Sequence, residues 1–226
     1  MNSTLWIFGH SVCLPYNLKN KAQAWPDIVS NQLNINCINL AQAASDNFFI
    51  YQCYLHHLPQ IGPDDIVIIS WSHYSRKSFV LNHDNPIQMA IVNQGMRYQT
   101  GKHEFIRGSN TSLNDANKWV NMKPVNRGVP YYDHWFQNYY SEYEQRCNFQ
   151  SYFDSVQLTC PGIYLPFFLN KESVQNINIS NIPNAGYMAE FILDNQVMIS
   201  LEDMHLNTLG HQLWANHIIK CLDLVI

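Results

Sequence analysis

The chain has 226 residues, of which 46% are hydrophobic and 13% are charged, and its formal net charge is -4 at pH 7. This length and this apolar content predict one domain with a sizeable core and argue against disorder. The weak negative charge, together with the lack of any cluster of Lys and Arg, offers no basic surface for a phosphate backbone, so nucleic acid is not expected as a partner.

Neither a membrane span nor an export signal is expected. No run of about 18 apolar residues is present in the sequence. The first residues have neither the basic start nor the long apolar run of a secretory signal. The six cysteines form no C-x-x-C pair, and in a chain of this kind they are expected to be free thiols in a reducing compartment. We therefore expect a cytoplasmic protein.

The first predicted element is a short buried strand over residues 5–8, which ends at Gly9, His10 and Ser11. Ser11 thus follows the carboxyl end of a strand, the edge at which open α/β sheets bind their ligands. A serine at this place is a candidate nucleophile. The alternative is that Ser11 only caps the helix that follows.

Three strand-then-helix units are predicted in the first 75 residues. After the first strand, apolar spacing predicts a helix that begins near Lys21 and carries Trp25 and Leu33 on one face. Residues 37–40 form a second short strand, and residues 47–58 have helical spacing. The third strand, over residues 65–71, is continuous and β-branched, as expected for a strand covered on both faces. This order predicts a central parallel sheet in a three-layer α/β/α sandwich.

The periodicity fades between about residues 79 and 130, which we predict to be a loop-rich insertion over one end of the sheet. A helix is predicted from residue 131 to about residue 156. Its aromatic stripe is expected to be core rather than a ligand-stacking surface; the stripe consists of Trp135, Tyr139 and Tyr143. Residues 162–168 read as a fourth parallel strand, and residues 208–224 as a closing amphipathic helix.

A serine nucleophile needs a base in hydrogen-bond reach, and the base works best when a carboxylate orients it. Near the end of the chain, Glu202 and Asp203 stand three and two residues before His205, in a loop that precedes the last helix. A carboxylate this close in sequence can hold the imidazole in one tautomer. A capping role for Asp203 is the alternative.

The order of these parts resembles the four sequence blocks of the SGNH (GDSL-like) hydrolase family, from residue 5 to about residue 220. Gly9, His10 and Ser11 stand where that family has Gly-Asp-Ser. The resemblance implies a flavodoxin-like α/β/α fold over the single domain 1–226. It also implies that the serine attacks an ester carbonyl, whose oxyanion is held by the serine N–H, by a backbone N–H of the second block and by an Asn side chain of the third.

The second and third blocks carry over unevenly. Ala44 stands at the glycine position of the second block, and because the donor there is a backbone N–H, alanine can supply it. In the third block His73 falls at the asparagine position, and Ser72 is a second possible donor. Arg76 is either a surface charge or an anion-binding side chain at the rim of the site. Trp71 suits stacking on a sugar but is equally a core candidate.

In the fourth block the family commonly places its acid three residues before the histidine, which selects Glu202 here. Relatives with an Asp-x-His spacing select Asp203 instead. We favour Asp203, because its shorter side chain suits a tight contact with His205, and keep Glu202 as the alternative acid.

The resemblance predicts a serine esterase or acyl hydrolase, or an acyltransferase that uses the same acyl-enzyme, acting on a small or carbohydrate-linked ester. Ser72, Arg76 and Trp71 are the expected substrate contacts. No cofactor and no metal are expected. The alternative is a non-catalytic module that binds a ligand or carbohydrate and retains the SGNH fold, which the changes at His10, Ala44 and His73 favour.

Two other reactive residue types are interpreted as structural. Cys13 has no basic neighbour to lower the pKa of its thiol, so we expect a core residue rather than a nucleophile. The ten histidines do not fall on one helix face with metal-ligand spacing. Among them, His211 is expected to pack or to cap at the start of the last helix.

Overall fold

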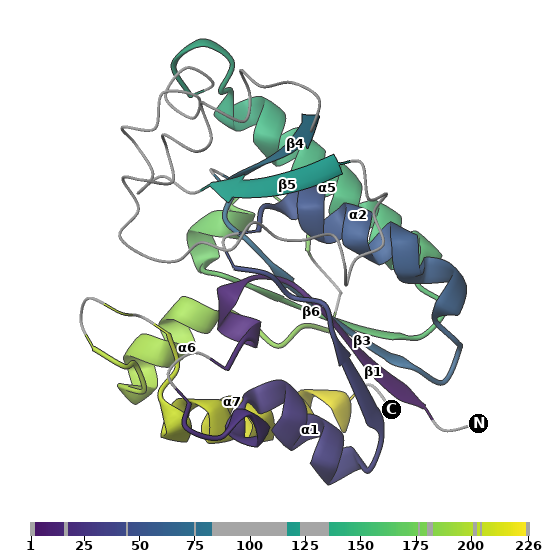
Figure 1. Ribbon diagram of the computed structural model, residues 1–226, viewed down its shortest axis with the longest axis vertical. Helices are drawn as coiled ribbons and strands as arrows, with labels where there is room; N and C mark the ends of the chain where they lie inside the picture. Colours follow the sequence, from purple (N-terminus) through teal and green to yellow (C-terminus); the bar gives the residue numbers. More distant parts are fainter. Residues whose placement is uncertain are drawn as a thin grey trace.

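Four parallel strands form the central sheet, in the order β2-β1-β3-β6 (Figure 1). The strands are β1 (Thr4–Phe8), β2 (Asn36–Asn39), β3 (Ile66–Trp71) and β6 (Ile163–Phe168). Each matches a strand predicted from the sequence to within a residue or two. Because all four run in the same direction, their carboxyl ends meet at one edge, where the first three sequence blocks also end.

The structure is a computed structural model that describes most of the chain. The described residues are 3–15, 18–43, 45–74, 76–82, 117–122, 136–175, 177–179, 183–200, 203 and 205–224.

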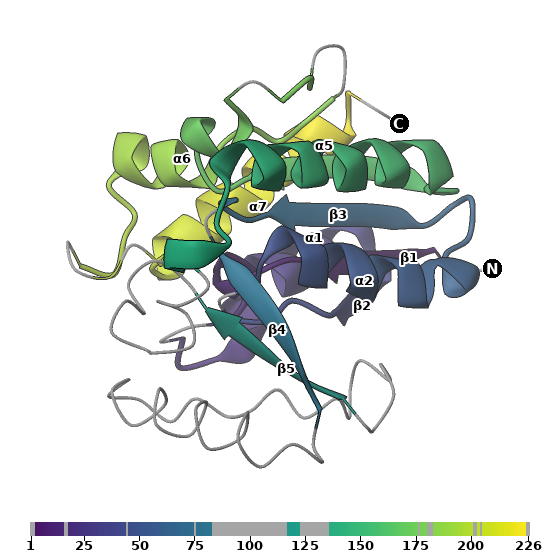
Figure 2. The same cartoon turned by 90° about the horizontal axis from the view of Figure 1, so that it is seen from above.

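Helices cover both faces of the sheet, as Figures 1 and 2 show. One face is covered by α1 (Trp25–Leu33), α6 (Met188–Asn195) and α7 (Thr208–Leu222), and the other by α2 (Asn47–His57) and α5 (Glu142–Thr159). The prediction of a three-layer α/β/α sandwich is therefore confirmed. Four short 3-10 helices complete the described elements: η1 (Ser11–Cys13), η2 (Lys21–Gln23), η3 (Leu58–Gln60) and η5 (Lys171–Val174).

Alternation along the strands divides the core into two hydrophobic clusters. In β1, Leu5 and Ile7 pack toward α1 and α7, whereas Trp6 and Phe8 pack toward α2 and α5. Every residue of β3 is buried, which explains why its sequence is continuously apolar rather than alternating. Burial of each large side chain contributes about 1.5–3 kcal/mol relative to exposure.

A second, two-stranded sheet follows the third sequence block. In it, β4 (Lys77–Asn82) pairs antiparallel with β5 (Asn117–Met122), so that Lys77 lies opposite Met122. These two strands bracket residues 83–116. That segment and residues 123–135 lie outside the described residues, so the loop-rich insertion predicted over residues 79–130 stays a prediction for most of its length.

The helix predicted from residue 131 to about residue 156 is interrupted at residues 139–141. Residues 136–138 are helical, and residues 131–135 lie outside the described residues. The helix α5 begins at Glu142, where the Ser141 side chain accepts a hydrogen bond from the Glu144 N–H and caps the first turn. The aromatic stripe is not core either, because Tyr139 is 64% exposed and Tyr143 is 80% exposed. Helical spacing alone did not show that Ser141 is the N-cap of a separate helix. The Tyr139 and Tyr143 rings, on either side of this cap, are exposed. Trp135 lies outside the described residues.

Two further properties concern the chain as a whole. Among the described helices, none combines the length and the apolar content that crossing a bilayer requires. All six cysteines are free thiols.

Candidate active site

Ser11 lies three residues after the end of β1, at the first position of the 3-10 turn η1. The turn is closed by hydrogen bonds from the Cys13 N–H to the His10 carbonyl (3.0 Å) and from the Leu14 N–H to the Ser11 carbonyl (3.1 Å). Ser11 is half-buried, and its hydroxyl makes no hydrogen bond with any described residue. The structure therefore gives Ser11 no capping role among these residues.

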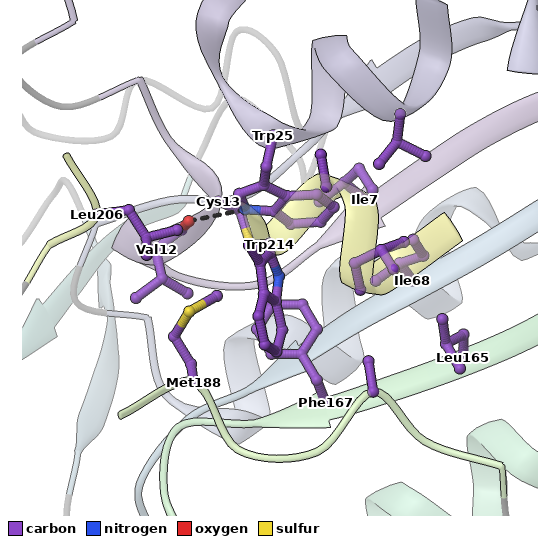
Figure 3. Packing of buried hydrophobic residues seen from close by; sticks show 14 of the residues in the cluster. Ile7, Val12, Cys13, Trp25, Ile68, Leu165, Phe167, Met188, Leu206 and Trp214 are labelled. Atoms are coloured by element: carbon purple, nitrogen blue, oxygen red, sulfur yellow. Dashed lines mark hydrogen bonds between the residues drawn. The ribbon is translucent and has the colours of Figure 1, made fainter. Parts of the chain in front are cut away.

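Two side chains from distant elements hold the turn that carries Ser11. The indole Nε1 of Trp25 donates to the Val12 carbonyl at 2.9 Å, a contact drawn in Figure 3. The amide Nδ2 of Asn39 donates to the Cys13 carbonyl at 2.8 Å. The Val12 carbonyl is thus held by a residue of α1, and the Cys13 carbonyl by the last residue of β2.

Gly9 lets β1 and β3 approach closely just before Ser11. A Cβ atom at this position would lie 2.5 Å from the Ser70 Cβ and 3.1 Å from the Cys13 Sγ. Only glycine avoids this overlap. The Gly9 carbonyl also accepts a hydrogen bond from the Gln42 N–H at 3.0 Å, which ties the second sequence block to the first.

Cys13 belongs to the core, as expected. Its side chain is fully buried in the cluster beneath α1 and α7 (Figure 3). Burial raises the pKa of its thiol to about 12, although the nearby Ser70 hydroxyl acts in the opposite direction. A thiol that stays protonated at neutral pH is not a nucleophile.

Asp203 and His205 are brought into direct contact. Oδ1 of Asp203 lies 2.5 Å from Nδ1 of His205 and also accepts the His205 backbone N–H at 3.1 Å. The Asp203 N–H in turn donates to the Ser200 hydroxyl at 3.1 Å. This arrangement holds the imidazole in one orientation. The alternative acid, Glu202, lies outside the described residues.

The loop that carries His205 is anchored to the start of α7. Met198 and Leu206 form an antiparallel bridge, and the Asn207 side chain accepts the Gly210 N–H at 2.8 Å as the helix cap. Leu206 is buried in the same cluster as Val12, as Figure 3 shows. The neighbours of His205 and of Ser11 therefore pack in one core.

His10, the residue before Ser11, is influenced by the charges of both His205 and Arg76. Its side chain is fully buried, and neither ring nitrogen makes a well-formed hydrogen bond with a described residue. Burial lowers the pKa of His10 well below its usual value, and the charges of Arg76 and His205 lower it further, while the Trp71 backbone acts in the opposite direction. His205 and Arg76 therefore both lie within electrostatic reach of the residue that precedes Ser11.

No direct hydrogen bond between the Ser11 hydroxyl and His205 is found among the described contacts. Catalytic hydrogen bonds in unliganded sites are commonly long and shorten when substrate binds. The roles of Ser11, His205 and Asp203 as a triad therefore stay predictions.

The second sequence block approaches the Ser11 turn through its backbone. The Ser45 hydroxyl donates to the Gln42 carbonyl at 2.8 Å, and the Gln42 N–H is bonded to Gly9. Ala44, the expected oxyanion donor of this block, lies between Gln42 and Ser45 in sequence but outside the described residues.

The third block is clamped by a residue that the sequence analysis missed. Oδ1 of Asn47 accepts the Ser72 N–H at 2.7 Å, and Nδ2 of Asn47 donates to the Ser72 carbonyl at 3.0 Å. The Ser72 side chain is fully buried and its hydroxyl has no partner among the described residues. An amide in the first turn of a helix is too common a feature for the sequence alone to single out Asn47.

His73, which stands at the family's asparagine position, faces a charged cluster. Its Nε2 lies 4.0 Å from the Glu172 carboxylate, and its ring centroid lies 4.2 Å from that of Tyr74. The Tyr74 ring is covered in turn by the Arg146 guanidinium at 4.6 Å. Burial lowers the pKa of His73, Glu172 raises it, and Arg76 lowers it.

Arg76, for which the sequence left open a surface charge or an anion-binding role, is half-buried. Nη1 of Arg76 lies 3.5 Å from the Ser45 carbonyl, and the Arg76 N–H donates to the His73 carbonyl at 3.1 Å. Burial lowers the pKa of the guanidinium to about 10, with Asp46 acting in the opposite direction. At neutral pH it is still a cation, held close to the second block.

Trp71 does not suit the substrate contact expected for it. Its side chain is 0% exposed, packed against Phe149 and Phe153 of α5. Its Nε1 donates to the Tyr164 hydroxyl at 2.9 Å, so its polar atom is satisfied inside the core. The end of β3 is covered by α5, and this burial leaves the indole no face for a ligand.

His211 has the packing role expected for it. Its side chain is buried, and Nδ1 accepts the Trp25 N–H at 3.1 Å, which joins α7 to the start of α1. Burial, together with the charge of His205, lowers the pKa of His211 to about 4. Across the described part of the chain, no three His, Cys, Asp or Glu side chains are grouped as metal ligands.

Comparison with known proteins gives structural similarity at low sequence identity. No family model and no curated protein matches the chain. A lipolytic protein of the G-D-S-L family from Desulfitobacterium hafniense is similar, with 13% identity, a TM-score of 0.51 and coverage of 97% of this chain and 99% of that one. The esterase EstA from Pseudoalteromonas is 10% identical, with a TM-score of 0.53 and coverage of 98% and 97%.

A third similar structure is that of a two-domain esterase, CEX, active on acetylated mannans. It is 13% identical, with a TM-score of 0.51, and the match covers 99% of this chain and 49% of that protein. Together with the parallel four-stranded sheet between helical layers, these similarities show that the chain has the fold of the SGNH (GDSL-like) hydrolases.

Proposed function

We propose that this chain, which has the SGNH-hydrolase fold, is a serine esterase that acts through an acyl-enzyme. The observation that carries the proposal is the 2.5 Å contact between Asp203 and His205, in a loop packed against the core beneath the Ser11 turn. An acid that orients a histidine beside a strand-end serine is the arrangement that nucleophilic acyl transfer needs.

In the proposed mechanism, the Ser11 Oγ attacks the ester carbonyl while His205 Nε2 takes its proton. Asp203 holds the His205 Nδ1–H and stabilises the imidazolium that forms. When the tetrahedral intermediate collapses, His205 gives the proton to the departing alcohol and Ser11 keeps the acyl group. Water then attacks the acyl-enzyme with His205 as base, which releases the acid and restores Ser11.

The negative charge on the carbonyl oxygen needs preorganised donors. The proposed backbone donors are the N–H groups of Ser11 and Ala44. The hydrogen bond between Gln42 and Gly9 (3.0 Å) supports this proposal, because it ties the block that carries Ala44 to the start of the Ser11 turn. His73 is the side-chain donor that the resemblance implies.

The proposed substrate is a small or carbohydrate-linked ester. One structural neighbour is active on acetylated mannans, although this chain matches about half of that protein. Arg76, close to the carboxyl edge of the sheet, is proposed to face the substrate. Ser72 is as fully buried as Trp71 and does not suit the substrate contact expected for it. If an alcohol rather than water enters the second step, the same acyl-enzyme gives acyl transfer.

A fluorophosphonate probe and p-nitrophenyl acetate test the proposal together. We expect one labelled site and measurable turnover in the wild type, and neither in Ser11→Ala, because only an activated serine reacts with the probe. Ser151→Ala, which alters an exposed serine of α5, is the matched control and is expected to behave as the wild type. An Ser11→Ala variant that is still labelled or still active rules out Ser11 as the nucleophile.

The second candidate is a non-catalytic module that binds a carbohydrate or another small ligand. Two observations favour it: the third block has His73 in place of the family's asparagine, and the Ser11 hydroxyl is not bonded to His205. In that case the wild type is not labelled, and Ser11→Ala binds acetylated mannan oligosaccharides as tightly as the wild type does in calorimetry.

A further inference from the structure

We infer that Arg76, rather than His73, is the side chain that stabilises the oxyanion formed at Ser11. The inference rests on the proposed esterase function and names a residue of its catalytic site. It follows from where the structure places the two side chains relative to the Ser11 turn.

His73 is directed toward groups other than the Ser11 turn. Its Nε2 lies 4.0 Å from the Glu172 carboxylate, and its ring is tilted by 32° against that of Tyr74, with the centroids 4.2 Å apart. Glu172 raises the pKa of His73, whereas burial and the charges of Arg76 and Arg146 lower it. His73, at the family's asparagine position, is thus in contact with Glu172 and Tyr74 at the rim of the site.

The Arg76 side chain contacts the second block, which is itself hydrogen-bonded to the residues that precede Ser11. Its Nη1 contacts the Ser45 carbonyl at 3.5 Å. Ser45 is joined to Gln42 through its hydroxyl, and Gln42 is joined to Gly9 through its N–H. Among the charged groups, Arg76 acts most strongly on His10, the residue directly before Ser11.

The hydrogen-bonding capacity of Arg76 is largely unused. A guanidinium has five N–H donors, and the side chain makes one long hydrogen bond, to Ser45, with the described residues. Within those residues no carboxylate lies within 4.0 Å of it; Asp46 acts from farther away, and its Oδ1 caps α2 through the Phe49 N–H at 2.7 Å. Holding a cation here costs solvation free energy, which an anion beside it would offset.

His10 keeps this charge available. The family's Gly-Asp-Ser motif would put a carboxylate at position 10, within reach of Arg76, and neutralise it. In this chain the residue is a fully buried histidine, which burial keeps uncharged. The cation is therefore left for the negative charge that develops on the carbonyl oxygen, where a charged donor is about twice as strong as a neutral one.

Three variants with p-nitrophenyl acetate as substrate test the inference. In Arg76→Gln we expect kcat to fall about 10²–10³-fold with little change in KM, as for loss of one oxyanion donor. Arg76→Lys, which keeps the positive charge, is expected to have a kcat at least about tenfold higher than that of Arg76→Gln. His73→Gln is expected to lose less than about tenfold, because its ring lies at the rim.

A transition-state analogue separates this role from a structural one. Affinity for a trifluoromethyl ketone, which forms an oxyanion on the serine, is expected to fall in parallel with kcat/KM in Arg76→Gln. Thermal unfolding and fluorophosphonate labelling of the same samples show whether the variant is folded.

Four outcomes overturn the inference. The first two are full activity in Arg76→Gln and a change in that variant confined to KM, which would make Arg76 a substrate-binding residue only. The third is unchanged affinity of Arg76→Gln for the ketone. The fourth is a loss of kcat in His73→Gln as large as that in Arg76→Gln. If Arg76→Gln does not fold, the Arg76→Lys and His73→Gln variants decide between the two side chains. A wild type that is neither labelled nor active overturns the proposed function as well.

Discussion

One carboxylate oxygen of Asp203 contacts both the ring and the backbone N–H of His205. Its Oδ1 lies 2.5 Å from Nδ1 of His205 and 3.1 Å from the His205 backbone nitrogen. The side chain and the backbone of His205 are thereby fixed relative to each other. In the proposed mechanism this leaves Nε2 as the ring nitrogen that exchanges the Ser11 proton.

Asp203→Asn is expected to lower kcat by about 10³–10⁴-fold, because an amide no longer stabilises the imidazolium and favours the wrong tautomer. The matched control is Glu202→Gln, which is expected to retain kcat within about threefold. Both are measured with p-nitrophenyl acetate under saturating conditions. A large loss in Glu202→Gln with a small one in Asp203→Asn assigns the orienting role to Glu202 instead.

His211 is expected to make the fold sensitive to acid. Its pKa is lowered from 6.5 to about 4 in the folded chain, so below pH 6.5 the unfolded chain binds a proton that the folded chain does not. The stabilisation is complete above pH 6.5 and is lost as the pH falls toward 4, by about 3 kcal/mol in all.

His211→Asn isolates this contribution, because an amide oxygen can still accept the Trp25 N–H but does not titrate. Between pH 7.5 and pH 5.0 the wild type is expected to lose about 2 kcal/mol more unfolding free energy than the variant, as measured by urea denaturation. His10 titrates in both proteins and cancels from the difference. Equal losses in the two proteins contradict the assignment.

Gly9→Ala is expected to destabilise the fold by about 1–3 kcal/mol through overpacking, since its Cβ would lie 2.5 Å from the Ser70 Cβ. Ser70→Gly in the same chain removes the clashing atom and is expected to restore part of the loss. Gly62→Ala, whose Cβ would meet its nearest atom at 3.7 Å, serves as the control. Additive effects of Gly9→Ala and Ser70→Gly in a double-mutant cycle would show that this contact does not carry the cost.

Asn47→Ala is expected to cost about 3 kcal/mol of unfolding free energy, because it leaves both the N–H and the carbonyl of buried Ser72 without their partners. Asn216→Ala, on an exposed face of α7, is expected to cost less than about 0.5 kcal/mol. Chemical denaturation of the two variants compares them directly. Similar stabilities would show that the Asn47 clamp contributes nothing measurable.

Much of the fold could be predicted from the sequence, because local patterns record burial. The continuous β-branched run of β3 is buried on both faces, and the apolar spacing of α7 follows its contact with α1. The start of α5 was missed because Ser141 begins a new helix inside a stretch of unbroken helical spacing. Periodicity shows which residues suit a helix, and it does not show where a cap interrupts it.

The pairing of Asp203 with His205 was accessible from sequence because the two residues are only two positions apart, so one loop brings them together. The roles of Trp71 and Arg76 were not accessible in this way. Trp71 is the last residue of β3 and Arg76 lies five residues later, yet Trp71 is fully buried against α5, whereas the Arg76 guanidinium extends to the Ser45 carbonyl. Burial and electrostatic environment depend on elements far away in the chain, so only the tertiary structure decided which of these two side chains is core and which is a half-buried cation beside Ser45.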